Sequence, residues 1–250
     1  MTTSMPDAIS PAGQPEPPPD VSVVIPAFNE EATIGVVVRG WESVLRALAL
    51  RFEILVCDDA SVDGSPAILE NLSRSMPALR IVRNRVNRGH GPTVRQGYAE
   101  AGGTWVMQVD ADGEVPAEEF ARLWSQRHDY DLLLGVRTPS WSSRGRRCVS
   151  SGAGHLIRLK FGRGVDDVNC PFRLIRRVSL LPMLNEIHSN STVPNVVMSG
   201  LAVRDGLRIF QAPVKHRERT GRPRRLMATA GLLARALQEV SRLDRRRRTP

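Results

Sequence analysis

Short apolar segments alternate with helical segments along the first half of the chain, and this alternation is the feature that most limits the fold. Val21 to Ile25 form a β-branched run that is closed by Pro26, which is typical of a buried parallel strand. Apolar residues between Ala32 and Leu50 instead recur at helical spacing. The same patterns predict strands at 21–25, 52–56, 79–82 and 104–109, and helices at 32–50, 66–76 and 94–101. We therefore expect a single α/β domain, Rossmann-like, with a mostly parallel central sheet flanked by helices.

Polar clusters follow three of these predicted strands. Asn29 and Glu30 come after the first strand, Asp58 and Asp59 after the second, and the segment 110–114 after the fourth. In open parallel sheets, ligands bind beyond the carboxyl ends of the strands. We therefore expect the three clusters to meet at one binding site.

The second half of the chain has a less regular pattern. A strand is expected at 131–136, followed by an Arg-rich loop at 137–147 and a helix that continues to about Lys160. A basic loop is expected at 214–225, and an amphipathic helix at 226–243. The domain boundaries predicted from this pattern are a Pro-rich disordered leader at 1–19, the main domain at 20–225, and a C-terminal helix with a basic tail at 226–250.

Composition limits the class of protein. With 250 residues, 41% hydrophobic and 24% charged, the chain is suited to one sizeable globular domain. Its three cysteines have no regular spacing, which argues against a disulfide framework or a zinc site. The N-terminus lacks the pattern of a signal peptide, and no window is apolar enough to span a membrane. We expect a cytoplasmic location.

The formal net charge of +9 suits partners that carry phosphate, but it does not choose between nucleotide, nucleic acid and anionic lipid. A nucleic-acid-binding module would need stacking platforms, yet the chain has two Tyr and six Phe, and no groove-reading motif is present. We therefore expect no nucleic acid partner.

Asp110 and Asp112 are two carboxylates, two residues apart, at the end of a predicted strand, and Glu114 follows closely. Such groups can converge on a hard cation as the chain turns, and Mg²⁺ or Mn²⁺ would share them with substrate phosphates. A solvated acidic turn is the alternative. A phosphatase of the haloacid dehalogenase type also uses such a motif, but it wants Thr or Val in place of Glu114. A dinucleotide-binding loop is disfavoured, because the segment 89–94 lacks the third glycine.

The segment 58–65 carries further acidic and hydroxyl groups. Asp58 directly follows an apolar strand, and its carboxylate could bind a base or ribose. Ser61 and Asp63 could do the same, or could serve only as caps for the next helix.

Four blocks together resemble family 2 glycosyltransferases of the GT-A fold. They are Val23-Val24-Ile25-Pro26-Ala27-Phe28-Asn29-Glu30-Glu31, the segment from Val56 to Ser65, Asn87-Arg88-Gly89-His90-Gly91, and Asp110-Ala111-Asp112. The branch that they resemble most contains dolichyl-phosphate mannose synthases and polyprenyl-phosphate glycosyltransferases. The resemblance extends from about residue 21 to residue 225.

The resemblance implies a nucleotide-sugar donor site with a Mg²⁺ or Mn²⁺ ion. Asp110, Asp112 and Glu114 would hold the metal, with Glu114 standing where the branch often has Gln. Gly89 and Gly91 would let the backbone pass close to the nucleotide, although a simple turn explains them equally well. The implied donor-binding residues are Pro26, Ala27, Asn29, Glu30, Asp58, Asp59, Gly89, Gly91, Asp110, Ala111 and Arg219.

In the second half, the resemblance implies an acceptor site made of basic and hydroxyl groups. Arg137 would face phosphate. Arg147 and Ser151, four residues apart on one helix face, match a pair that holds acceptor or donor phosphate, and we expect them at the acceptor phosphate. The segment 167–173 resembles an Asp-to-Gly-Phe-Arg block, but Pro171 replaces the Gly. The basic loop with His216 and Arg219 departs in spacing, and Pro223 replaces a common Ser.

The branch transfers its sugar with inversion by direct displacement, and the expected catalytic residues are Asp112, Arg137 and Asp167. A polyprenyl phosphate acceptor is already an anion near neutral pH, so positioning and charge neutralisation suffice. A hydroxyl acceptor needs a general base, for which Asp167 and Glu114 are candidates. Both acceptor classes stay open.

The predicted C-terminal helix allows two interpretations. It has an apolar face with Leu226, Leu233 and Val240, and many arginines nearby. It could attach peripherally to the anionic inner face of the plasma membrane, where a lipid-phosphate acceptor would lie, or it could pack on the core with a solvated tail.

Overall fold

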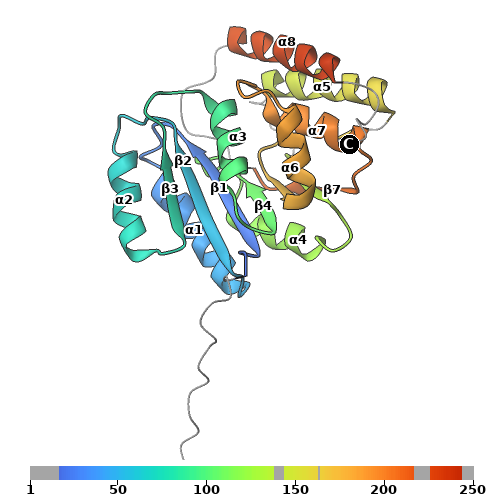
Figure 1. Ribbon diagram of the computed structural model, residues 1–250. Coiled ribbons are helices and arrows are strands. Elements are labelled where there is room, and N and C mark those ends of the chain that lie inside the picture. The colour runs from blue at the N-terminus through green and yellow to red at the C-terminus, as the bar shows by residue number, and fades with distance from the viewer. Residues whose placement is uncertain (1–16, 138–143, 163, 217–225, 244–250) are drawn as a thin grey trace, which may run out of the picture.

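The computed structural model describes residues 17–137, 144–162, 164–216 and 226–243. These residues form a seven-stranded sheet in the order β3-β2-β1-β4-β6-β5-β7 (Figure 1). Parallel pairing joins β3, β2, β1 and β4, and it also joins β5 to β7, whereas β6 runs antiparallel between β4 and β5. The mostly parallel α/β sheet predicted from the sequence is confirmed. The strands are β1 (Val21–Ala27), β2 (Phe52–Asp58), β3 (Leu79–Arg83), β4 (Trp105–Gln108), β5 (Leu132–Arg137), β6 (Arg173–Arg176) and β7 (Ile209–Val214).

Helices cover both faces of the sheet, because successive side chains of each strand point to opposite faces. Val23 and Ile25 of β1 pack into the hydrophobic cluster that includes residues of three helices, while Val24 packs into a second cluster on the other face. The helices of the first face are α1 (Ile34–Ala47), α2 (Ser65–Ser75) and α4 (Phe120–Ser125). Those of the second face are α3 (His90–Glu100), α5 (Arg144–Phe161), α6 (Arg177–Glu186), α7 (Pro194–Arg204) and α8 (Leu226–Arg242). A short 3₁₀ helix, η1 (Ala117–Glu119), precedes α4.

Strand β1 continues through Pro26, which was expected to end it. Its pairing with β4 extends only to Val24 opposite Gln108, whereas its pairing with β2 continues to Ala27 opposite Asp58. Pro26 therefore lies beyond the part of the strand that is paired on both sides, where a proline is tolerated.

The second half contains elements that were not predicted. They are β6, α6 and α7, together with β7, which ends at Val214, the first residue of the segment expected to be a basic loop. Helix α3 also begins at His90, four residues before its predicted start.

Helix α8 packs on the rest of the domain. Ala236 and Val240 are fully buried against the cluster that includes α5 and α7, and Leu233 is half-buried and contacts the position of Gly152. Nζ of Lys160 donates hydrogen bonds to the carbonyl oxygens of Val240 (3.1 Å) and Ser241 (2.6 Å), which satisfies the C-terminal end of α8. Core packing is thus the role that the structure gives to the apolar face of this helix. No helix in the described ranges is long and apolar enough to cross a membrane.

Candidate active site

The loops after β1 and β2 are tied to each other by polar side chains. The backbone N–H of Asn29 donates to Oγ of Ser61 (2.9 Å), and Oδ1 of Asn29 accepts from the N–H of Val62 (2.9 Å). The N–H of Glu30 donates to Oγ of Ser65 (2.9 Å). Asn29 also adopts a positive φ of 54°, which Asn tolerates better than most residues. Asn29 and Ser61 therefore hold two predicted donor-binding loops in one arrangement.

Asp58 is fully buried at the end of β2. Its Oδ1 accepts from the N–H of Ser61 (3.0 Å), and its Oδ2 pairs with Nε of Arg83 (3.1 Å). Burying a carboxylate costs free energy unless hydrogen bonds or a charged partner compensate it. Asp58 thus stabilises the loop 58–61 through its hydrogen bond with Ser61. Its contact with a nucleobase remains a prediction.

Asp59 organises the loop that leads into α3. Oδ1 accepts from Nδ2 of Asn84 (2.8 Å) and from the N–H of Arg88 (2.9 Å), and Oδ2 accepts from the N–H of Gly89 (2.8 Å). Gly89 has φ 89°, a conformation that favours glycine. Asp59 and Gly89 therefore shape one turn at the carboxyl edge of the sheet.

Gly91 lies in the first turn of α3, and its need for glycine comes from a neighbouring loop. A Cβ at this position would lie 2.0 Å from the carbonyl oxygen of Ser191 and 2.8 Å from Cα of Thr192. Both neighbours are backbone atoms that cannot swing aside. The structure thus gives Gly91 a packing role that the sequence motif did not reveal.

The acidic loop after β4 begins where the N–H of Val109 donates to the carbonyl oxygen of Val24 (3.0 Å). Oδ1 of Asp112 accepts from the N–H of Glu114 (3.1 Å), and the turn between them is completed by Gly113 at φ 68°. Ala111 is buried in the core, so its side chain anchors the loop. Asp110 and Asp112 are held at the edge of the sheet by this turn.

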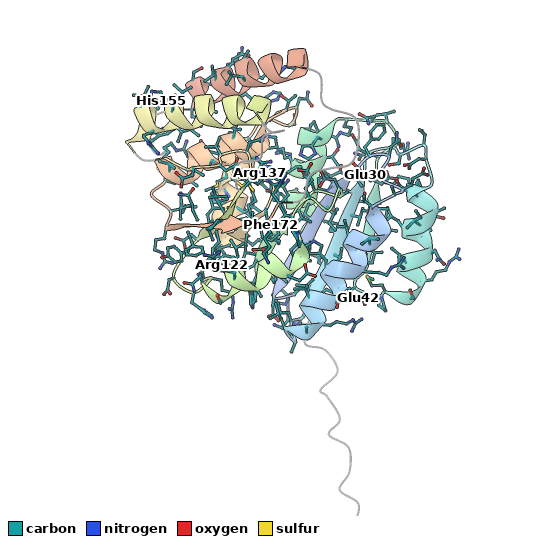
Figure 2. The ribbon with its side chains drawn as sticks, turned by 180° about the vertical axis from the view of Figure 1, so that it is seen from behind. Glu30, Glu42, Arg122, Arg137, His155 and Phe172 are labelled. Atoms are coloured by element: carbon teal, nitrogen blue, oxygen red, sulfur yellow. The ribbon has the colours of Figure 1, made fainter. Side chains whose placement is uncertain are left out.

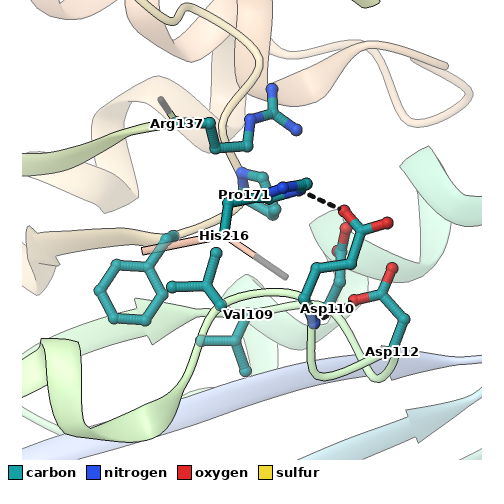
Figure 3. Close-up of a pocket in the computed structure, with 9 residues that line it drawn as sticks. Val109, Asp110, Asp112, Arg137, Pro171 and His216 are labelled. Atoms are coloured by element: carbon teal, nitrogen blue, oxygen red, sulfur yellow. Dashed lines mark hydrogen bonds and ion pairs between the residues drawn. The ribbon is translucent and has the colours of Figure 1, made fainter. Parts of the chain in front are cut away.

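A small pocket opens beside this loop (Figure 3). Figure 3 shows His216 and Arg137 across the pocket from the loop that carries Asp110 and Asp112. The pocket joins the end of β4, the end of β5, the segment before β6 and the end of β7. Its lining residues are Val109, Asp110, Asp112, Glu114, Val115, Arg137, Pro171, Phe172 and His216.

Arg137 lines the pocket and is paired with Asp167. Nε and Nη2 of Arg137 donate to the two carboxylate oxygens of Asp167 at 2.7 and 2.9 Å. Burial by itself lowers the pKa of Arg137, but the Asp167 carboxylate and nearby acidic groups raise it above its ordinary value. Arg137 therefore stays a cation, and Asp167 is a buried carboxylate that is already engaged by it.

Glu114 pairs with His216 in the same pocket. Oε2 of Glu114 lies 2.7 Å from Nε2 of His216, and both side chains are largely buried. This pair links the acidic loop to the residues just after β7. Sequence reasoning singled out both residues separately, but only the fold brings them together.

The donor set at the acidic loop fits a hard divalent ion. Oδ1 of Asp110 is buried and has no hydrogen-bond partner within the described part of the chain, and it lies 3.9 Å from Nε2 of His90. Among the described residues, no three His, Cys, Asp or Glu side chains are arranged to hold an ion by themselves. One or two carboxylates are what Mg²⁺ or Mn²⁺ uses when phosphates and water supply the remaining ligands. Glu114 as a third ligand remains a prediction.

The predicted donor and acceptor residues lie on the same edge of the sheet where the structure describes them. Figure 2 shows Glu30 and Arg137 at a similar height in the view, with Glu42 well below them. Arg147 and Ser151 lie on α5, but their side chains are outside the described part, and Arg219 falls outside the described residues altogether. The lining residues to which sequence reasoning gave no role are Val109, Val115, Pro171 and Phe172. For Pro171 and Phe172, the resemblance of the segment 167–173 to a known block was the available signal.

Comparison with protein families gives one match over most of the chain. The model of glycosyl transferase family 2 matches residues 22–181. An undecaprenyl-phosphate 4-deoxy-4-formamido-L-arabinose transferase of Erwinia tasmaniensis is 34% identical over 202 residues, and one of Klebsiella pneumoniae is 30% identical over 202 residues. Each alignment covers 80% of this chain, and the chain spans only 60% of the length of these relatives.

Solved structures of two glycosyltransferases share the fold. A mannosyltransferase of Pyrobaculum calidifontis in complex with GDP-Man and Mn²⁺ has a TM-score of 0.58 at 19% identity, covering 92% of this chain and 75% of that one. Glucosyl-3-phosphoglycerate synthase of Mycobacterium tuberculosis, in complex with Mn²⁺, UDP-Glc and phosphoglyceric acid, has a TM-score of 0.60 at 19% identity, covering 90% and 81%. The predicted GT-A fold is confirmed by these likenesses, which at this identity concern the fold alone.

Proposed function

Because the chain belongs to glycosyl transferase family 2, we propose that it transfers a sugar, with inversion, from a UDP- or GDP-sugar to the phosphate of a polyprenyl phosphate. The names of its relatives support a lipid-phosphate acceptor, and the nucleotide sugars bound in the structural neighbours support the donor class. The sugar itself is left open.

One observation carries the proposal: a single pocket has two aspartates on one wall and a permanently charged guanidinium on another. Asp110 and Asp112 suit the metal end of a diphosphate, and Arg137 suits an acceptor phosphate. Both halves of a transfer between two phosphate-bearing substrates can therefore meet in one place.

On the donor side, Asp110 and Asp112 would hold a Mg²⁺ or Mn²⁺ ion. When bound, such an ion neutralises the charge that develops on the leaving diphosphate. The tied loops that carry Asn29 and Asp58 would receive the nucleoside, because they lie next to the acidic loop at the same edge of the sheet.

On the acceptor side, Arg137 would orient the phosphate by paired hydrogen bonds. A phosphate oxygen then attacks the anomeric carbon from the face opposite the leaving group. The new bond to that oxygen forms as the bond to the nucleoside diphosphate breaks, which inverts the configuration. The acceptor oxygen is already an anion, so no side chain must remove a proton, and the engagement of Asp167 by Arg137 is compatible with this.

A hydroxyl acceptor is a second candidate, and the pair formed by Glu114 and His216 favours it. A carboxylate bonded to an imidazole within the pocket could accept a proton from a hydroxyl group. Asp167 could do so only if its pair with Arg137 opened. The two candidates share the donor site and differ in whether turnover depends on lipid phosphate.

The test is an assay of nucleoside diphosphate release with a panel of UDP- and GDP-sugars, with Mn²⁺ or Mg²⁺, and with or without undecaprenyl phosphate in detergent. The proposal expects lipid-dependent release, an inverted anomeric signal in the product by NMR, and loss of activity with EDTA. Asp112→Ala should be inactive, while Asp129→Asn, a change at an exposed carboxylate, should retain activity. Release with a sugar or glycan hydroxyl acceptor, but not with the lipid, would replace the first candidate by the second. An active Asp112→Ala would overturn both.

We further propose peripheral contact with the inner face of the plasma membrane. The apolar face of α8 is engaged by the core, so the contact would be electrostatic, through exposed Arg235 and Arg242. Sedimentation with anionic vesicles should weaken with salt and with Arg235→Gln/Arg242→Gln. If the double variant bound the vesicles as strongly as wild type, α8 would take no part in the membrane contact.

A further inference from the structure

Arg173 is a fully buried charged residue at the first position of β6. It lies opposite Gln108 of β4 and Leu134 of β5, in the middle of the sheet and just behind the pocket. A guanidinium this far from water must be compensated by the protein. The hydrogen-bond acceptors around its guanidinium show which segments Arg173 holds in place.

The hydrogen bonds of Arg173 go to backbone carbonyl oxygens. Nε and Nη2 donate to the oxygen of Cys170 at 3.0 and 2.8 Å, Nη2 also donates to the oxygen of Val168 at 3.1 Å, and Nη1 donates to the oxygen of Asn195 at 3.0 Å. The planar guanidinium thus joins the segment before β6 to the start of α7.

The segment held in this way forms part of the pocket. Its first residue, Asp167, makes the paired hydrogen bonds to Arg137, and Pro171 lines the pocket. Oγ of Ser199 adds a second tie, because it donates to the oxygens of Val168 (3.0 Å) and Asn195 (2.9 Å). Without Arg173, the carbonyl oxygens of Val168 and Cys170, which follow Asp167 in the chain, would lose these hydrogen bonds.

A buried polar chain connects the same region to the acidic loop. The hydroxyl of Tyr98 donates to Oε1 of Gln108 (2.7 Å) and lies 3.5 Å from Oδ1 of Asn195. Gln108 stands two residues before Asp110 and opposite Arg173 in the register. Buried polar contacts of Tyr98 therefore connect the strand that leads into the acidic loop with the start of α7, to which Arg173 also binds.

We propose that Arg173 is a positioning residue of the site. By holding the carbonyl oxygens of Val168 and Cys170 it sets the place of Asp167, and through Asp167 it sets the orientation of Arg137. Lysine cannot replace it, because a single ammonium group cannot span carbonyl groups that are held by a planar fork. The role of Arg137 in catalysis rests on the proposed function, but the hold of Arg173 on the segment does not.

Hydrogen–deuterium exchange tests the hold without any substrate. Arg173→Lys should raise the amide exchange rate in the segment 165–172 by about tenfold or more, while the strands of the sheet keep their protection from exchange. The matched control is Arg177→Lys, since Nε of Arg177 also donates to a backbone carbonyl, that of Ala101 (2.9 Å), at the start of α6 and away from the pocket. Unchanged exchange at 165–172 in Arg173→Lys, or the same increase there in Arg177→Lys, would overturn the proposal.

Kinetics test whether the hold acts through Asp167. Arg173→Lys should lower kcat by on the order of 10- to 100-fold with donor KM nearly unchanged, because a small displacement of a positioned group is costly. In an Asp167→Asn background the same change should cost less than about threefold, since the route through Asp167 is already broken. An equal loss in both backgrounds means that Arg173 acts in another way. If the wild-type chain turns over no donor, the proposed function fails, and the exchange measurement alone decides the place of Arg173.

Discussion

Nε2 of His216 lies 2.7 Å from Oε2 of Glu114, so the end of strand β7 is tied to the loop that carries Asp110 and Asp112. The two residues are separated by 102 positions in sequence. Their contact closes one side of the pocket. It also means that the acidic loop depends on the second half of the chain for its shape.

His216→Ala should therefore loosen the acidic loop and leave the largely buried carboxylate of Glu114 without this partner. We expect a loss of about 0.5–3 kcal/mol in the free energy of unfolding, the range for the loss of one hydrogen bond to a neutral or charged group. Donor turnover should fall with it. Chemical denaturation and nucleoside diphosphate release measure the two effects. His128→Ala, at an exposed histidine, is the control and should change neither; wild-type stability in His216→Ala would show that the pair contributes nothing.

Asp59→Asn should disturb the loop before α3 without changing the size of the side chain. An amide presents N–H groups where Asp59 now accepts hydrogen bonds from Asn84, Arg88 and Gly89, so at least one donor must face another. We expect a loss of about 1–3 kcal/mol in unfolding free energy and a higher KM for the donor. Isothermal calorimetry with the nucleoside diphosphate checks the binding side. Unaltered donor affinity in Asp59→Asn would show that this loop does not contribute to donor binding.

Gly91→Ala should be strongly destabilising, because the new Cβ would lie 2.0 Å from the carbonyl oxygen of Ser191. Backbone must move to relieve this contact, which costs typically about 1–3 kcal/mol or more. Gly40→Ala in α1 is the matched control, since a Cβ there meets nothing within 4 Å. It should be neutral or stabilising by up to about 1 kcal/mol, from helix propensity. Urea unfolding of the two variants should move in opposite directions, and a stable Gly91→Ala would disprove the close approach of the loop.

Asp131 should make stability depend on pH in the acid range. Hydrogen bonds from Arg208, with help from nearby Arg176, lower the pKa of Asp131 below its usual 3.8, although burial opposes this. A lowered folded-state pKa stabilises the fold above the unfolded-state pKa, and this contribution is lost as pH falls through the folded-state pKa. Wild type should thus exceed Asp131→Asn in stability at pH 7. The difference should begin to shrink only below about pH 4, near the unfolded-state pKa, and should be lost as pH falls through the lowered folded-state pKa. Urea midpoints measured from pH 7 down to pH 2 provide the check. A constant difference at all pH values would assign the effect to packing.

The first four strands and the first two helices were close to their predicted positions because their signals are local. A run such as Val21 to Ile25 can hardly be anything but a buried strand, and α1 shows its apolar face in its spacing. Strand β6 was missed since its four residues begin and end with Arg, and one of these arginines is fully buried. Helix α7 was missed because it is buried from Pro194 to Val203, so it has no polar face to reveal a period.

The candidate site divides in the same way. Asp110, Asp112, Asp58 and Asp59 were predicted as site residues because acidic residues that follow apolar strands mark the carboxyl edge of a parallel sheet. Their individual tasks were not visible, since whether an aspartate holds a loop or faces the pocket depends on which backbone N–H groups lie beside it. Asp59 holds a loop, and Asp110 faces the pocket.

From the sequence alone, the alternation of strands and helices determined the α/β sheet, and the acidic clusters determined at which edge of it the site lies. These are properties of neighbours along the chain. The pairing of Arg137 with Asp167, the pairing of Glu114 with His216, and the carbonyl oxygens around Arg173 were decided only by tertiary structure. Each of these contacts joins segments that the sheet order brings together, and no local pattern carries that information.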